Sequence, residues 1–141
     1  MVVLTHGNNK LKTLKTEVVK MNKLDEARNR FSHMSDMQLF DIIDEIAKTI
    51  TVRTYNEHGS SDDSRESSKE EYLIIRNIAY SAIRTLSFDY KSDVNSIVEM
   101  AENTLITFMN GLPQFSDWGV AHCNSYDTIY KPLLRLFGVW G

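Results

Sequence analysis

The chain has 141 residues, of which 42% are apolar and 25% are charged, and its formal net charge is −3. This length suffices for one domain with a core, and the negative charge argues against non-specific binding to nucleic acid. No apolar run approaches the roughly 20 residues that span a bilayer, so we expect no membrane partner. The single cysteine, Cys123, cannot form an internal disulfide, which favours a reducing compartment and predicts a cytoplasmic protein.

The first twenty residues are basic, because four lysines and one glutamate give +3 and leave −6 for residues 21–141. Residues 16–21 can be back-translated into a purine-rich ribosome-binding sequence followed by a start codon. We therefore interpret residues 1–20 as a basic leader that is non-native or flexible. Residues 21–141 would then be a single helical domain of bacterial or phage origin that starts at Met21. A natural start at Met1 is the open alternative.

Two helices are predicted before residue 50. Apolar residues recur at spacings of three and four from Leu11 to Phe31, which predicts a first helix over about 10–32. Ser35 and Asp36 are good N-caps for a second helix. The expected apolar face of that helix consists of Met37, Phe40, Ile43, Ala47 and Ile50. Residues 49–55 are rich in β-branched side chains, so a short strand after this helix is an open alternative.

Residues 56–71 form a tract without one aliphatic or aromatic side chain, in which six acidic groups face two basic ones. Structureless connections of this length are uncommon inside compact domains and are usually disordered or functional. Neither half of the chain is long enough to be a domain by itself. We therefore expect a long acidic loop, over about 56–70, that leaves one helical bundle and returns to it.

The second half of the chain has the clearest helix signals. A capping box at Ser68, or one position earlier at Ser67, begins a third helix that extends to about residue 90. A fourth helix follows Ser92 or Asp93 and ends before Gly111. After an irregular stretch with one helical turn, a short final helix is expected over 131–137. These elements predict an all-α single domain, most simply an irregular antiparallel bundle of four to five helices.

One short string has the residue types of a catalytic site. His33 follows Arg28 with four residues between them, and the polar Asn29 comes directly after the arginine. The string resembles the R-x4-6-H motif of HEPN-domain ribonucleases, which are small and all-α. The resemblance implies a symmetric dimer that cleaves RNA without a metal, in which Arg28 stabilises phosphate charge, Asn29 assists and His33 is the general acid or base. The alternative is a solvated helix face without a catalytic role.

Other motifs indicate neither a cofactor nor a metal ion. The string from His122 to Asn124 holds the residue types of a cysteine nucleophile site, but adjacent residues rarely point at each other, so a structural cysteine is favoured. His58, Asp62 and Asp63 lack the ordered ligand alternation of a calcium loop. The sequence contains no phosphate-binding or dinucleotide-binding glycine motif.

Aromatic residues are concentrated near the C-terminus, where they serve either as core or as a recognition surface. A small acidic chain without catalytic motifs has the physical profile of bacterial immunity proteins and phage inhibitors, whose acidic surfaces are steered towards basic targets. We therefore expect a protein-binding module that acts as an inhibitor, immunity-type protein or adaptor of a basic or nucleic-acid-binding protein. A helical subunit of a larger assembly is a further alternative. The candidate binding residues are Asp62, Asp63, Glu66, Trp118 and Tyr126.

Overall fold

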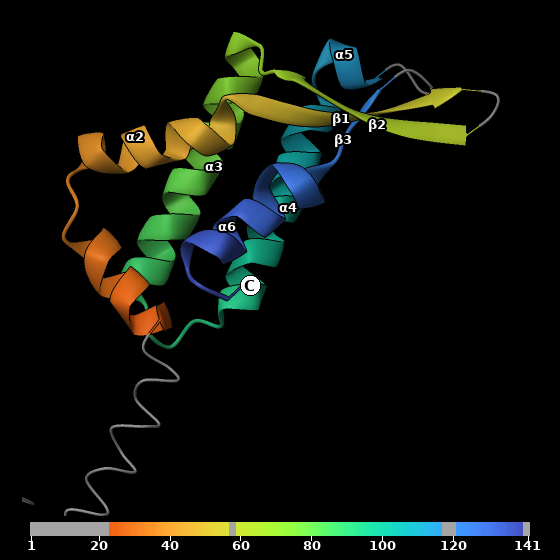
Figure 1. Cartoon of the computed structure of the whole chain (residues 1–141). Helices are drawn as coiled ribbons and strands as arrows, with labels where there is room; N and C mark the ends of the chain where they lie inside the picture. Colours follow the sequence, from red (N-terminus) through yellow and green to blue (C-terminus); the bar gives the residue numbers. More distant parts are fainter. Residues whose placement is uncertain (1–22, 57–58, 117–120, 140–141) are drawn as a thin grey trace, which may run out of the picture.

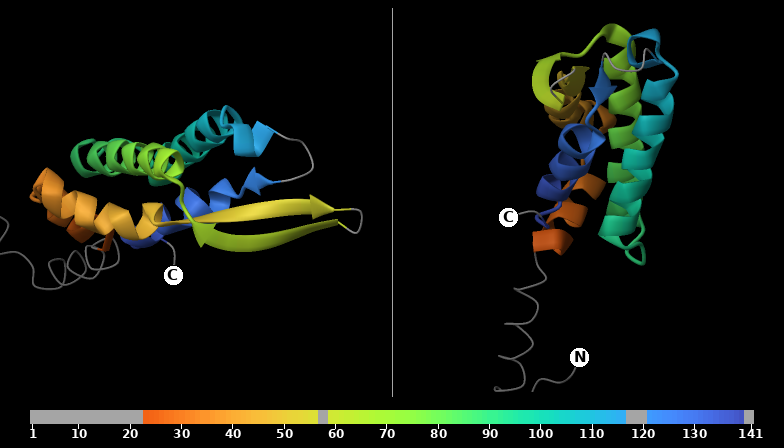
Figure 2. Two further views of the ribbon diagram at one scale, coloured as in Figure 1. Left: turned by 90° about the horizontal axis from the view of Figure 1, so that it is seen from above. Right: turned by 90° about the vertical axis from the view of Figure 1, so that its right-hand side faces the viewer.

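The computed structural model describes residues 23–56, 59–116 and 121–139 (Figure 1). Two long helices, α3 and α4, lie side by side in one layer with α5 at the end of α4, and the other described elements form a second layer against them (Figure 2). The elements follow one another as a helix over 23–32, α2 Asp36–Ala47, β1 Thr49–Asn56, β2 Gly59–Glu66, α3 Lys69–Phe88, α4 Val94–Asn110, α5 Pro113–Ser116, β3 His122–Cys123, the π-helical turn η2 Tyr126–Tyr130 and α6 Lys131–Leu136. The predicted leader and both candidate starts lie outside the described residues.

Side-chain caps set where the main helices begin, as the sequence predicts. The Ser35 hydroxyl accepts from the Gln38 N–H, and the Gln38 side chain accepts from the Ser35 N–H, which completes a capping box for α2. Ser68 and Glu71 form the same box for α3. The carboxylate of Asp93 caps α4 by accepting a backbone N–H. Each cap satisfies N–H groups that the first turn of a helix leaves without partners.

Helix α2 packs antiparallel on α3 through rows of residues spaced four apart. The α3 row is Tyr72, Arg76, Tyr80 and Arg84, and the α2 row is Asp36, Phe40 and Asp44. The Tyr72 hydroxyl donates to Asp44, and the Arg76 guanidinium lies 3.8 Å from the centre of the Phe40 ring. Hydrogen bonds from Arg84 and then from Tyr80 lower the pKa of Asp36. The charged residues of this α3 row therefore face α2.

The buried face of α2 differs from the predicted one. Leu39, Ile43 and Ala47 are fully buried, whereas Met37 is 79% exposed. Phe40 lies at the edge of the interface, with its ring 5.1 Å from the Tyr80 ring. The sequence of α2 has two overlapping apolar rows, and the position of α3 decides which of them is covered.

The prediction of an all-α bundle with a long acidic loop is wrong in part. The fold is mostly helical but contains a small antiparallel sheet with the strand order β2-β1-β3. Strand β1 confirms the strand alternative after α2, and residues 59–66 of the expected loop form β2. Backbone pairing with β1 and the Arg53–Asp62 ion pair, at 2.8 Å, hold this strand although it has no apolar side chain. A polar, charged strand suits the edge of a sheet, where its second backbone edge stays unpaired.

Glu71 is a fully buried carboxylate that joins three elements of the fold. It accepts two hydrogen bonds from the Arg65 guanidinium, at 2.8 and 2.7 Å, one from the Ser68 N–H and one from the Gln114 amide. Burial disfavours the charged carboxylate, but the hydrogen bonds from Arg65, Ser68 and Gln114 outweigh it and lower the pKa of Glu71 to about 2. The network therefore ties β2, α3 and α5 together.

The C-terminal segment, residues 126–138, is attached to the rest of the fold near both of its ends. The Thr128 hydroxyl accepts a hydrogen bond from the Thr51 N–H at 3.2 Å, which attaches η2 to β1. At the other end the Phe137 ring lies 5.2 Å from the ring of Phe31 in the first described helix. Gly138, at φ 70°, ends the final helix where expected, and a Cβ at this position would lie 3.1 Å from the Cβ of Lys23. These attachments place η2 and α6 alongside α4.

Candidate functional site

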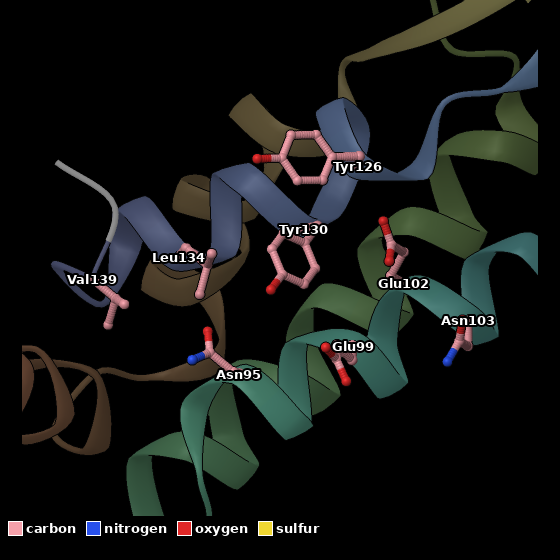
Figure 3. A pocket seen from close by; sticks show the side chains of 8 residues that line it. All are labelled: Asn95, Glu99, Glu102, Asn103, Tyr126, Tyr130, Leu134 and Val139. Atoms are coloured by element: carbon pink, nitrogen blue, oxygen red, sulfur yellow. The ribbon is translucent and has the colours of Figure 1, made fainter.

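A groove of about 590 Å³ lies between α4 on one side and η2 and α6 on the other (Figure 3). Its walls combine two carboxylates, two amides, two phenol rings and two aliphatic side chains. These are Asn95, Glu99, Glu102, Asn103, Tyr126, Tyr130, Leu134 and Val139. We name it the tyrosine–glutamate groove.

The aromatic wall is a product of the η2 turn. Tyr126 and Tyr130 are four residues apart, and their rings stack with centres 5.3 Å apart at an interplanar angle of 19°. Thr128 and Ile129, between them in sequence, are buried and direct the turn against the body of the fold. Lys131 forms an ion pair with Asp127 at 3.2 Å and lies 5.7 Å from the centre of the Tyr126 ring. Tyr126 is 39% exposed and Tyr130 is half-buried, so the stacked pair remains partly accessible to solvent.

The opposite wall carries negative charge. Glu99 and Glu102 are one turn apart on α4 and point to the same side of the helix. Burial, followed by the charges of Glu99 and Glu102, raises the pKa of Tyr130. Within the described residues, neither glutamate takes part in an ion pair. Two carboxylates that have no ion-pair partner among the described residues lie opposite an aromatic pair, one ring of which already has the Lys131 ammonium nearby, and such a site is suited to a positively charged group.

The sequence-predicted binding residues fall into separate regions. Tyr126 lines the groove, whereas Asp62, Asp63 and Glu66 lie on β2 and do not line it. Asp62 is paired with Arg53, and the Asp63 carboxylate accepts from the Ser64 N–H at 2.9 Å. Trp118 lies outside the described residues.

Sequence reasoning missed Glu99 and Glu102 as members of a site. Their spacing of three on an amphipathic helix is a usable signal, but it indicates only that they share a face. The partners on that face come from η2, more than twenty residues later in the chain.

The residues of the ribonuclease-like string have structural contacts. Arg28 is buried, donates to the Leu86 carbonyl at 3.0 Å and the Ser92 carbonyl at 3.1 Å, and lies 5.1 Å from the centre of the Tyr90 ring. Asn29 is exposed, and His33 turns back to its carbonyl with a contact of 2.7 Å from Nδ1. The guanidinium of Arg28 is thus directed inwards, to the connection between α3 and α4.

Cys123 is half-buried on β3, with its Sγ 3.9 Å from the Thr128 hydroxyl. Burial raises the pKa of this thiol to about 11. Within the described residues, no group of three or more His, Cys, Asp or Glu side chains is arranged to hold a metal ion. No helix in the same residues is long and apolar enough to cross a membrane.

We expect Cys123 to react slowly with a thiol reagent in the folded protein. At pH 8 a thiol with a pKa of about 11 is ionised to roughly one part in a thousand, against roughly one in ten for an ordinary thiol of pKa 9. The rate of reaction with a chromogenic disulfide should therefore rise about a hundredfold when the protein is unfolded in urea. Equal rates in the folded and unfolded protein would show that the thiol is not protected.

A second groove, of about 680 Å³, lies between α2, β1 and the C-terminal segment. It combines aliphatic side chains such as Ile42, Ile46 and Leu136 with charged groups of both signs, Asp41 and Arg135 among them. This mixture selects no particular ligand chemistry. The tyrosine–glutamate groove is more specific because its charged residues have one sign and face an aromatic pair.

Comparisons of the chain with protein-family models, with curated proteins and with solved structures gave no match. A fold alone would not determine an activity, because unrelated functions occur on the same architecture. The chemistry of the tyrosine–glutamate groove is therefore the basis for a function.

Proposed function

We propose that the chain is a protein-binding module that takes a lysine or arginine side chain of a basic partner into the tyrosine–glutamate groove. The observation that carries this proposal is the juxtaposition of Glu99 and Glu102, which have no ion-pair partner among the described residues, with the stacked rings of Tyr126 and Tyr130. A cation in the groove gains carboxylate charge on one side and an aromatic face on the other.

The interactions expected for a cation in this groove are strong enough to contribute to binding. A cation over a tyrosine face contributes about 0.5–2 kcal/mol, depending on how far it is desolvated. Charge-assisted hydrogen bonds to the carboxylates add to this, and tyrosine is enriched among residues that dominate binding energy. The amides of Asn95 and Asn103 can bind backbone groups that flank the basic side chain. The net charge of −3 favours encounter with a basic protein surface.

A module of this kind acts as an inhibitor or an adaptor. Occupying the basic surface of a nucleic-acid-binding protein would block it, because the same lysine and arginine side chains contact phosphate. The acidic edge strand β2, with Asp63 and Glu66, is a second candidate contact for such a surface. Substitutions in the groove and in β2 distinguish these two candidate contact surfaces.

Removing the two groove carboxylates should weaken binding of a basic peptide. The probe is a ten-residue peptide of alternating arginine and glycine, titrated calorimetrically at low salt into the full chain. We expect the Glu99→Gln/Glu102→Gln double variant to bind it about tenfold more weakly, because two attractive charges are lost from a partly desolvated site. Tyr126→Ala should cause a loss of similar size through the cation–π contact and the stacked ring.

The matched control is Asp63→Asn/Glu66→Gln, which removes the same charge from β2. This control should leave the affinity within about twofold of the unsubstituted chain, since its residues lie outside the groove. If the control weakens binding and the groove variants do not, β2 is the contact surface and the groove assignment is wrong. No measurable binding to the arginine peptide by the unsubstituted chain would contradict a basic partner altogether.

A further inference from the structure

The face of α3 and α4 that points away from the second layer carries a shallow valley. In both views of Figure 2 the other described elements lie on the opposite side of this helix pair, apart from α5 at the end of α4. The valley has a volume of about 310 Å³ and an apolar floor formed by Ile78, Ala82, Ile97 and Ala101, with Met100 at its side. We name it the α3–α4 valley.

No residue that lines the α3–α4 valley is charged, although a quarter of the chain is. Four charged residues of the two helices are directed elsewhere, and Lys69 and Glu70 lie exposed at the start of α3, beyond the residues that line the valley. On α3, Arg76 and Arg84 face α2, and on α4, Glu99 and Glu102 line the tyrosine–glutamate groove. The polar positions of the valley are neutral hydroxyl and amide side chains, among them Asn77, Ser81, Thr85 and Thr104.

Exposed apolar side chains extend the valley at both ends. Leu73 is four residues before Asn77 and Phe108 four after Thr104, so each shares a helix face with a valley residue. Phe88, three after Thr85, lies at the edge of this face, and the Arg84 guanidinium is 6.0 Å from the centre of its ring. The exposed fractions are 63% for Met100, 62% for Phe88, 56% for Phe108 and 41% for Leu73. Together these four side chains expose on the order of 400 Å² of apolar surface, enough to mark an interaction site.

We propose that the α3–α4 valley binds a second copy of the chain, so that two α3–α4 pairs pack face to face around a two-fold axis. In such an interface a surface meets itself. Charged residues would then be brought close to like charges, whereas hydroxyl and amide groups both donate and accept and can pair with their own copies. For an acidic chain, this neutral face is therefore one on which identical molecules can meet without charge repulsion.

The exposed area around the α3–α4 valley is compatible with an interface to a second copy of the chain. A standard interface buries about 800 Å² per partner, and the exposed apolar side chains supply roughly half of it. The neutral polar residues that flank the floor add to this area. Small residues in the middle of the valley, Ser81, Ala82 and Ala101, leave space for Met100 of the other copy. The tyrosine–glutamate groove lies on the other flank of α4, so the dimer keeps both grooves open.

Light scattering coupled to size-exclusion chromatography, with sedimentation analysis of the full chain, tests the proposal. We expect a dimer with a dissociation constant of micromolar order, which added salt does not weaken, because no opposite charges meet in it. Met100→Lys should raise the dissociation constant at least thirtyfold, since it places two buried like charges in the interface. The matched control is Met37→Lys, on an exposed methionine of α2 outside the valley, and it should dimerise like the unsubstituted chain.

Circular dichroism of both variants checks that they are folded, which is expected because both methionines are more than half exposed. A chain that stays monomeric at concentrations well above the micromolar range would overturn the proposal and leave the valley to a helix of another protein. A dimer weakened equally by Met100→Lys and Met37→Lys, or not weakened by Met100→Lys, would show that the copies meet through a different face. None of these results depends on binding in the tyrosine–glutamate groove.

Discussion

Replacing Glu71 by glutamine should lower the free energy of unfolding by about 3 kcal/mol at pH 7, the largest effect expected for any single charge in this fold. The substitution puts a neutral amide where a buried carboxylate accepts from Arg65, Ser68 and Gln114. The NH₂ group of the glutamine would then face at least one of these hydrogen-bond donors. The Arg65 guanidinium would also lose the negative charge that it pairs with. The midpoint of thermal unfolding should fall by about 10 °C.

The same substitution should change how stability depends on pH. The pKa of Glu71 is about 2 in the fold against 4.5 for an ordinary glutamate, so the unfolded state takes up the proton first as pH falls. The stability that the charged carboxylate provides is complete above about pH 4.5 and is lost as pH falls towards 2. Urea unfolding at pH 7, 4 and 2.5 should therefore show the gap between the unsubstituted chain and the Glu71→Gln variant closing with acid.

Glu70→Gln is the matched control, because this glutamate is the exposed neighbour of Glu71 on the same first turn. We expect it to change the free energy of unfolding by less than about 0.5 kcal/mol. Similar losses for Glu70→Gln and Glu71→Gln would mean that the charge acts through the helix dipole alone and not through Arg65 and Gln114.

Replacing Arg28 by alanine should cost about 2–3 kcal/mol of unfolding free energy. The buried guanidinium donates to the carbonyls of Leu86 and Ser92, at the end of α3 and in the connection to α4, and its loss leaves an acceptor at Leu86 in an apolar environment. The measurement is urea unfolding at pH 7. Arg30→Ala is the control: this arginine is exposed and lies 4.7 Å from the centre of the Phe31 ring, so its removal should cost about 1 kcal/mol or less.

The Arg28 experiment also bears on the ribonuclease-like alternative. If Arg28 serves only the fold, the unsubstituted chain should show no RNA cleavage that disappears in a His33→Ala variant. A stable Arg28→Ala protein that lost an RNA-cleaving activity, together with the same loss in His33→Ala, would favour the catalytic interpretation instead.

Local sequence was sufficient to predict, to within one residue, where α2, α3 and α4 begin. The caps at Ser35, Ser68 and Asp93 and the final helix with its terminating Gly138 follow from side-chain and backbone groups within a few residues of each other. Such interactions depend little on the rest of the fold. The same reasoning failed for β2, because the partner that makes residues 59–66 a strand is β1, and a polar edge strand has no apolar pattern to reveal it.

The sequence by itself therefore determined a mostly helical chain, its capped helices and the strand tendency of residues 49–55. Tertiary structure decided the parts that carry the proposed function and much of the stability. Arg28 meets Leu86 across 58 positions in sequence, Glu71 meets Gln114 across 43, and the tyrosines of η2 meet the glutamates of α4 only after the chain has turned back. Contacts over such separations depend on how whole elements pack, and no local pattern records them. The acidic tract shows the difference most clearly: its charges are visible in the sequence, but only pairing with β1 makes it a strand and only burial makes Glu71 a structural residue.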